Sequence, residues 1–251
     1  MSMSDWSALK TELAEWRARD MILPVWWRDD DATAMSASLK RLSKMARDYG
    51  LVAHLAVIPQ SIDVSLSDEV KDNESLICLV HGWQHKNHAL TGKKCEFGTD
   101  RPLLERTKEL QDGRLALRAA FGPKALDVFV PPWNRIGDDL IPELPQLGYQ
   151  AISTYLPRKT KTAVEGLLQV NTHLDPIDWR GSRSAVSTNQ FSEHAARLLK
   201  DRRLGETDAS EPLGFLSHHL VHDQAIWDLV EAFWDIVMTG QAISVLPFER
   251  R

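Results

Sequence analysis

The chain repeatedly runs from a short apolar segment into a cluster of polar residues. The clearest cases are Ile22–Trp27 before Arg28-Asp29-Asp30-Asp31, Ser75–Val80 before His81-Gly82-Trp83-Gln84-His85, and Leu126–Val130 before Pro131-Pro132-Trp133. Apolar runs of this length are typical of buried strands, and the amphipathic segments between them are typical of helices. A strand, helix, strand order favours parallel pairing. The pattern therefore predicts an α/β fold, with the polar clusters gathered at the carboxyl ends of the strands.

Length and composition indicate one globular domain. The 251 residues suit a single barrel-sized domain over 1–251, with an amphipathic N-terminal helix at about 4–20. A net charge of −5 argues against a general nucleic-acid binder, and two cysteines cannot form a disulfide framework. No stretch approaches the roughly 20 apolar residues of a membrane span. We expect a cytoplasmic protein with neither nucleic-acid nor membrane partners, and leave its oligomeric state open.

The motif His81-Gly82-Trp83-Gln84-His85 carries two histidines four positions apart. On a helical turn, that spacing puts both imidazoles on one side, and imidazole is the commonest side-chain ligand for metals. The alternative is a surface helix with two unrelated histidines. Because a buried strand leads directly into the motif, we favour a metal site.

Three aspartates, Asp29, Asp30 and Asp31, follow a buried strand. Adjacent carboxylates repel one another, so a cation, a metal, a shared proton or solvent must offset the repulsion. The alternative is a solvated turn in which Asp31 caps the next helix. A further cluster, with His218, His219 and His222, follows the apolar run Leu213–Leu216.

Together these clusters specify hydrolytic chemistry. One carboxylate and two imidazoles make a three-ligand metal site with a position left for water or substrate. A second carboxylate beside it is a natural general base, and a histidine from a distant strand is a natural general acid. Backbone N–H groups nearby would stabilise an oxyanion. The set predicts hydrolysis of an amide or ester.

The ordered motifs also resemble those of the polysaccharide deacetylases, the NodB-homology or carbohydrate esterase family four enzymes. The matching segments are Arg28-Asp29-Asp30-Asp31, His81-Gly82-Trp83-Gln84-His85, Pro131-Pro132-Trp133, Asp178-Trp179 and Leu216-Ser217-His218, which extend over about 24–223. The resemblance implies a single-domain, distorted (β/α) barrel with seven or eight mostly parallel strands. It also implies a divalent metal ion and removal of acetyl groups from N-acetylated sugars.

The resemblance assigns a role to each motif. It implies Asp29 as the catalytic base and His218 as the catalytic acid, with Asp30, His81 and His85 as metal ligands. Pro132 and Trp133 belong to the motif whose aromatic N–H serves the oxyanion hole, and Asp178 with Trp179 to the motif that orients the acid and walls the site.

Several positions depart from the family pattern. Asp31 stands where glycine is usual, so base and ligand are alternatively Asp30 and Asp31. Val130 stands where an arginine usually holds the catalytic aspartate, and Arg28 or Arg135 would have to replace it. His219 directly follows His218 and competes for the acid role.

We expect one divalent ion, zinc before cobalt or nickel, and a small-molecule or oligosaccharide substrate. The tryptophans beside the motifs suit stacking against a sugar ring or, alternatively, wall a core. Two other functions stay open. One is an inactive relative that binds a glycan or metabolite, motivated by Val130. The other is a hydrolase of a non-sugar C–N bond.

Overall fold

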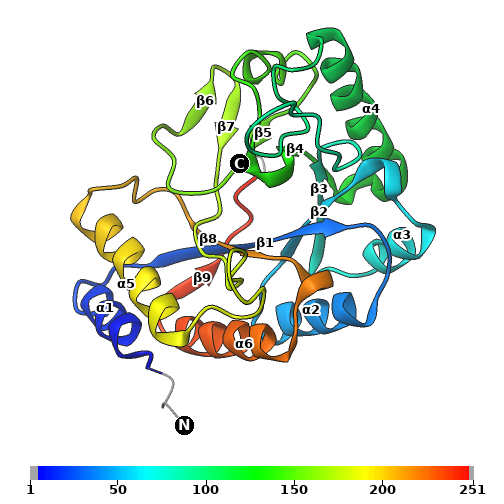
Figure 1. The fold of residues 1–251 in the computed structure, drawn as a ribbon. Coiled ribbons are helices and arrows are strands. Elements are labelled where there is room, and N and C mark those ends of the chain that lie inside the picture. Colours follow the sequence, from blue (N-terminus) through cyan, green and yellow to red (C-terminus); the bar gives the residue numbers. More distant parts are fainter. Residues whose placement is uncertain (1–4, 249–251) are drawn as a thin grey trace.

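A computed structural model describes residues 5–248 as one mostly parallel sheet surrounded by helices (Figure 1). The strand order is β6-β7-β5-β4-β3-β2-β1-β8, β9 pairs with β1, and only the β6–β7 pair is antiparallel. The strands are β1 Leu23–Ala32, β2 Ala53–Val57, β3 Leu76–His81, β4 Ala125–Val130, β5 Ala151–Ile152, β6 Thr162–Val164, β7 Leu167–Gln169, β8 Leu213–Ser217 and β9 Ala242–Ser244.

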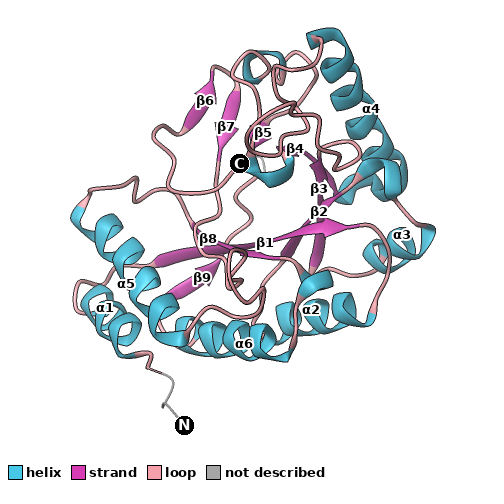
Figure 2. Cartoon of the chain, viewed as in Figure 1, coloured by secondary structure: helices cyan, strands magenta, loops and turns pink. Residues whose placement is uncertain are grey.

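In the described part of the chain, six α-helices lie around this sheet (Figure 2). They are α1 Ser7–Arg17, α2 Ala37–Asp48, α3 Val64–Lys71, α4 Leu103–Phe121, α5 Thr188–Leu204 and α6 Gln224–Met238, and short 3-10 turns occupy Pro59–Ser61, Gly122–Lys124, Pro132–Asn134, Ile141–Glu143 and His219–Val221. Side chains of Ser36, Asp63, Ser187 and Asp223 cap four of the α-helices, as short polar residues do. Within residues 5–248, no helix combines the length and apolar character that crossing a membrane requires.

Loop backbone brings the two ends of the sheet together. After β7 the chain forms an isolated parallel bridge between Leu174 and Phe215 of β8, and the Leu216 N–H donates to the Leu174 carbonyl at 2.7 Å. Within residues 5–248, no regular strand closes the sheet at this point. The α/β class and the distorted barrel are therefore confirmed.

The two faces of β1 have different environments, because successive strand residues point to opposite sides. Trp26 faces the barrel interior, where it packs with Ala56, Leu79 and Val130. Its neighbour Trp27 faces the helices and packs against Phe215 of β8 and Trp234 of α6. This alternation puts Arg28 and Asp30 on the interior side with Trp26, and Asp29 on the helix side with Trp27.

Some element boundaries differ from the sequence prediction. The prediction ended the first strand at Trp27, but β1 continues through the aspartates to Ala32. Asp31 is therefore a strand residue, and Ser36 rather than Asp31 caps α2. The helix α3 and the antiparallel strand β6 were not predicted. The N-terminal helix is shorter than predicted at 7–17, and residue 4 lies outside the described residues.

Candidate active site and metal centre

A cavity of about 640 Å³ lies at the carboxyl ends of the parallel strands. This volume falls within the range of small-molecule sites, and this edge is where α/β barrels carry their chemistry. The lining comes from several separate segments: Asp30, Asp31, His81, His85, Lys94, Trp133, Asn134, Arg135, Tyr155, Asp175, Ile177, Trp179, Arg180, Arg183, Leu216 and His218.

Three of these side chains converge as a candidate metal-binding set. Asp31 Oδ1 lies 3.1 Å from His81 Nε2 and 3.2 Å from His85 Nε2. The three ligand atoms lie within 4.8 Å of one another, and residues 5–248 contain no other such group of histidine, cysteine or acidic side chains. A carboxylate oxygen and two imidazole nitrogens are a fitting donor set for zinc or a similar divalent ion.

Asp31 reaches this position through an irregularity in β1. The pairing with β2 shifts between Asp30 and Ala32, so that Asp31 has no partner of its own, and its φ is +74°. Such a bulge re-aims a side chain that strict alternation would point to the opposite face. Asp30 and Asp31, although adjacent in sequence, therefore both line the cavity.

The two histidines are held in different ways. His81 ends β3, and its Nδ1 lies 3.0 Å from the Val130 carbonyl, which leaves Nε2 free to face the centre. His85 stands in a loop with φ +57° rather than on a helical turn, so the predicted helical spacing is wrong although the two imidazoles do meet. Their ring centroids are 5.1 Å apart.

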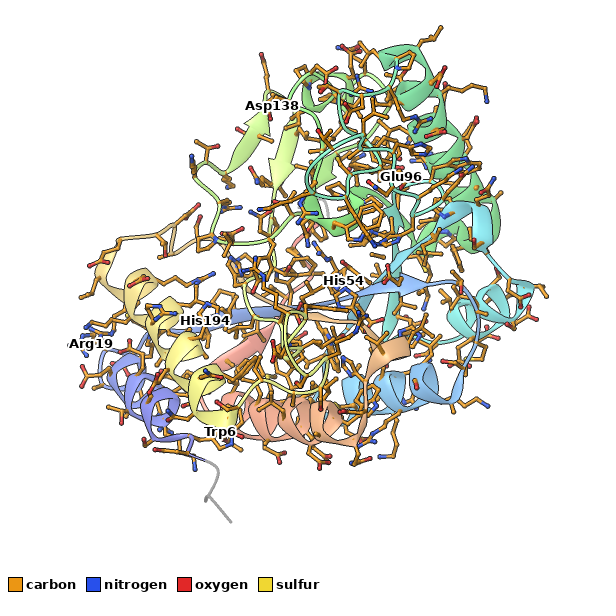
Figure 3. All side chains as sticks on the ribbon, in the orientation of Figure 1. Trp6, Arg19, His54, Glu96, Asp138 and His194 are labelled. Atoms are coloured by element: carbon orange, nitrogen blue, oxygen red, sulfur yellow. The ribbon has the colours of Figure 1, made fainter. Side chains whose placement is uncertain are left out.

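A buried glutamate organises the loop that carries His85. Glu96 accepts hydrogen bonds from the N–H groups of Trp83 and Gln84 at 3.2 and 2.7 Å. Burial raises the pKa of Glu96. Gly82 is required here, because a Cβ on it would lie 2.1 Å from Glu96 Oε2 and its φ is +61°. Sequence reasoning missed Glu96, which lies in the loop between β3 and α4 without a recognisable motif (Figure 3).

Asp30 is paired with an arginine from its own strand. Arg28 Nε and Nη2 donate to the two carboxylate oxygens of Asp30 at 2.8 and 3.0 Å. The remaining Arg28 hydrogen bonds go to Ser153, the Thr154 carbonyl and Asn134. Arg28 is fully buried, so the guanidinium is fixed with Asp30 in the bidentate geometry that arginine prefers. The Asp30 carboxylate therefore has a cationic partner although the nearby strand end at Val130 supplies none.

Asp29 lies on the other face of β1, away from the cavity. Its carboxylate accepts hydrogen bonds from the Ser217 hydroxyl at 2.5 Å and the His219 N–H at 3.0 Å, and His219 Nδ1 lies 2.5 Å from its other oxygen. Trp27 Nε1 donates to the Ser217 hydroxyl at 2.8 Å. Asp29, Ser217 and His219 are fully buried. Of the two predicted catalytic residues, Asp29 is therefore the one that does not line the cavity.

His218 points into the cavity, whereas His219 points away from it. The His218 and Trp179 rings meet in a T-shaped arrangement with centroids 4.8 Å apart, and Trp179 Nε1 donates to Asp175 at 2.8 Å. Burial raises the pKa of Asp175. Asp178 does not join this group: its carboxylate accepts hydrogen bonds from the Gly181 and Ser182 N–H groups in an exposed turn.

A strained turn after β4 brings Trp133 to the cavity. Trp133 and Asn134 have φ of +55° and +56°, a region that side-chain-bearing residues seldom adopt. The turn is closed by the N–H groups of Asn134 and Arg135, which donate to the carbonyls of Pro131 and buried Pro132. These bonds do not use the Trp133 N–H. Asn134 also accepts from Arg28, which ties the turn to the Asp30 pair.

The electrostatics suit Asp31 as a ligand. Burial acts against its charge, but His81, His218 and His85 outweigh it and hold the pKa of Asp31 well below its usual range. The carboxylate is therefore ionised at neutral pH, as a metal ligand must be.

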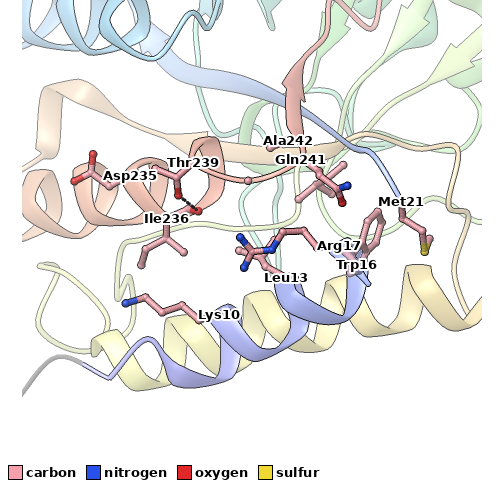
Figure 4. Close-up of a pocket in the computed structure, with 12 residues that line it drawn as sticks. Lys10, Leu13, Trp16, Arg17, Met21, Asp235, Ile236, Thr239, Gln241 and Ala242 are labelled. Carbon is pink, nitrogen blue, oxygen red and sulfur yellow. Dashed lines mark hydrogen bonds between the residues drawn. The ribbon is translucent and has the colours of Figure 1, made fainter. Parts of the chain in front are cut away.

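A second cavity, of about 360 Å³, lies between α1, the end of α6 and β9 (Figure 4). Its lining includes Lys10, Trp16, Arg17, Asp235 and Gln241. None of the histidines or aspartates that the motifs single out borders it.

Comparison with known proteins agrees with this geometry at the level of the fold. No family model matches the chain, and no curated protein matches it in sequence. Among solved structures, a carbohydrate esterase of family 4 from Streptococcus mutans has a TM-score of 0.58 at 12% identity, covering 94% of this chain and 90% of its own.

Two further structures are similar over most of their length. A family 4 carbohydrate esterase from Streptomyces lividans, in complex with acetate, has a TM-score of 0.56 at 16% identity and covers 88% and 91% of the two chains. A peptidoglycan deacetylase from Bacillus subtilis has a TM-score of 0.54 at 14% identity and covers 89% and 88%. The chain thus has the fold of the polysaccharide deacetylases and family 4 carbohydrate esterases.

Proposed function

We propose that this protein is a metal-dependent hydrolase that removes an acetyl group from an N-acetylated sugar or a related amide. The observation that carries the proposal is the convergence of Asp31, His81 and His85 in a cavity that also contains Asp30 and His218. Solved structures with the same fold include deacetylases and esterases of carbohydrates, which supports the same class of reaction.

In this proposal Asp31, His81 and His85 hold one divalent ion, with zinc expected before cobalt or nickel. The ion would supply a water of lowered pKa and Lewis acidity toward the acyl carbonyl. The bond from His81 Nδ1 to the Val130 carbonyl fixes the tautomer that leaves Nε2 available as a ligand.

We assign the general base to Asp30 rather than Asp29. Asp30 lines the cavity, and Arg28 holds its carboxylate from the side. During attack on the acyl carbon, Asp30 would accept the proton of the attacking water. Arg28 thereby takes the place of the arginine that the family pattern has at Val130. The assignment corresponds to the alternative register, with base and ligand at Asp30 and Asp31.

His218 is proposed to donate a proton to the leaving amine as the C–N bond breaks, which releases acetate and the free amino group. The Trp179–Asp175 pair fixes the wall against which the His218 ring lies. The Trp133 N–H would donate to the oxyanion that forms on the carbonyl oxygen, because the turn does not use it internally.

The test measures metal content and acetate release together. We expect about one metal ion per chain, the stoichiometry that one three-ligand centre provides. Acetate release from N-acetylglucosamine oligomers should be abolished by chelation and restored by added metal. The double variant His81→Ala/His85→Ala should lose both metal and activity, whereas His88→Ala, in the same loop but outside the ligand set, should keep both.

The outcome also separates the alternative functions. A wild-type protein that takes up no metal after reconstitution contradicts the proposed mechanism. Metal uptake with sugar binding but no turnover would indicate an inactive relative. Hydrolysis of simple formamides or cyclic amides, without acetate release from sugars, would assign a non-sugar C–N bond.

A further inference from the structure

The cavity has a cationic mouth that the proposed hydrolytic reaction does not require. Four basic side chains line it: Lys94, Arg135, Arg180 and Arg183. They come from three separate parts of the chain, namely the loop after β3, the turn after β4 and the loop before α5. The whole chain carries a net charge of −5, so this concentration runs against its overall composition.

These four side chains have no acidic partners. Within residues 5–248, none of them forms a salt bridge. Other arginines do, among them Arg28, Arg101, Arg106, Arg114, Arg158 and Arg203. Lys94 lies over the Trp133 ring at 5.8 Å and Arg183 over the Trp179 ring at 5.9 Å. The Arg135 side chain donates one hydrogen bond, to the Lys94 carbonyl at 2.8 Å. Aromatic contacts orient a cation without neutralising it, so the charge remains available to a ligand.

The carboxylates of the same cavity do not cancel this charge. Asp30 is neutralised by Arg28, and Asp31 lies between two histidines. None of the four basic side chains donates to Asp175; its carboxylate accepts from Trp179, and burial raises its pKa. The inner end of the cavity is therefore balanced internally, and the mouth carries uncompensated positive charge.

The two tryptophans are also less available for stacking than the sequence suggested. Trp133 has His85 at 4.5 Å between centroids and Lys94 over the ring, and Trp179 contacts His218 and Arg183. A ligand entering the mouth would meet cationic groups at these tryptophans as well as aromatic surface. Uncompensated arginines that converge on a small-molecule cavity are suited to bind oxyanions.

We infer that the substrate is a small acylated sugar that carries an oxyanion, either a carboxylate or a phosphate, and that Arg180 and Arg183 help to bind it at the mouth. The inference rests on the proposed hydrolytic function for the acyl end of the substrate. A cavity of about 640 Å³ accommodates a mono- or disaccharide rather than a long polymer segment.

Binding of reaction products tests the anion site independently of turnover. Calorimetric titration at low ionic strength should give a dissociation constant for glucosamine 6-phosphate, or for muramic acid with its carboxylate, at least about tenfold lower than for glucosamine. The variant Arg180→Gln/Arg183→Gln should remove this difference. The control Lys40→Gln/Lys200→Gln, which removes two exposed charges on α2 and α5, should keep it. Equal affinities for all three sugars, or no binding of any of them, would overturn the inference.

Turnover then identifies the anion. The metal-loaded protein is assayed with N-acetylglucosamine, N-acetylglucosamine 6-phosphate and N-acetylmuramic acid, whose carboxylate replaces the phosphate. We expect at least one anionic substrate to exceed the neutral sugar about tenfold in kcat/KM, and the advantage to shrink at high salt. A neutral sugar hydrolysed as well as both anionic ones would refute the anion site but leave the hydrolase intact. Selective binding of the anionic product without any turnover would support the anion site but contradict the hydrolytic function.

Discussion

Asp29 and Asp30 are neighbours on β1, yet they belong to two different polar networks. Asp30 lies on the interior face, open to the cavity and paired with Arg28. Asp29 lies on the helix face, sealed among Ser217 and His219. Both carboxylates are almost fully buried and both interact with a cationic or cation-forming group. Access to the cavity, rather than burial or pairing, distinguishes a candidate catalytic group from a structural one.

The largest expected effect comes from the Arg28–Asp30 pair, which is open to the cavity. Asp30→Asn keeps the shape of the side chain but removes the proposed base, so kcat should fall by about 10²–10⁴-fold, the usual contribution of general base catalysis. Metal content should stay at the wild-type value because Asp31, His81 and His85 are unchanged. The checks are kcat for acetate release, elemental analysis and circular dichroism. A variant that keeps its activity but loses the metal would reverse the assignment of Asp30 and Asp31.

A substitution in the buried network of Asp29, Ser217 and His219 should lower the free energy of unfolding and not kcat. Asp29→Asn leaves His219 without its counter-charge in a fully buried position, which typically costs about 3–5 kcal/mol. Denaturant unfolding should show this loss, while kcat per folded molecule changes by less than about tenfold because Asp29 does not line the cavity. A stable protein with abolished turnover would instead restore Asp29 as the base.

Acidic pH should lower the free energy of unfolding through His54 in the barrel interior. Burial lowers the pKa of His54, an interior residue that contacts Trp26, to about 4 from 6.5. The unfolded chain binds the His54 proton more readily than the folded protein does. The stabilisation linked to neutral His54 is therefore complete above about pH 6.5 and is lost as the pH falls toward 4. This group contributes on the order of 3 kcal/mol over that window. Comparing the unfolding free energies of wild type and His54→Gln from pH 7 to 4 checks it, and parallel curves would contradict the contribution.

The smallest effect should come from Asp178, which the motif resemblance put in the site. It caps an exposed turn through the Gly181 and Ser182 N–H groups, so Asp178→Ala should leave kcat/KM within about twofold. The matched change at Asp175, Asp175→Asn, should lower kcat/KM by more, because Asp175 fixes Trp179 against His218. Steady-state kinetics on both variants decides between them, and equal losses would return Asp178 to the site.

The sequence was sufficient for the fold and for half of the residues that line the cavity, among them His81, His85 and His218, because strand periodicity and strand-end clusters are local signals. It was insufficient where placement depends on one residue of register. The bulge at Asp31 is a backbone irregularity that no residue type announces. The roles of Glu96 and Asp175 depend on contacts across loops, and neither belongs to a recognisable motif. His218 and His219 differ only in which face each presents, which the end of β8 determines.

The pairing of Arg28 with Asp30 places the proposed base and its supporting cation on the same strand. A carboxylate whose supporting cation arrives from another strand works only while both strands keep their relative position. Here the cation and the carboxylate are two residues apart on one strand, so they share a backbone and move together. An Arg-x-Asp segment is in this sense a self-contained unit that an enzyme designer can transplant onto the strand of another barrel. With this pairing no charged residue is needed at the end of β4, so the apolar side chain of Val130 is compatible with the proposed hydrolytic function.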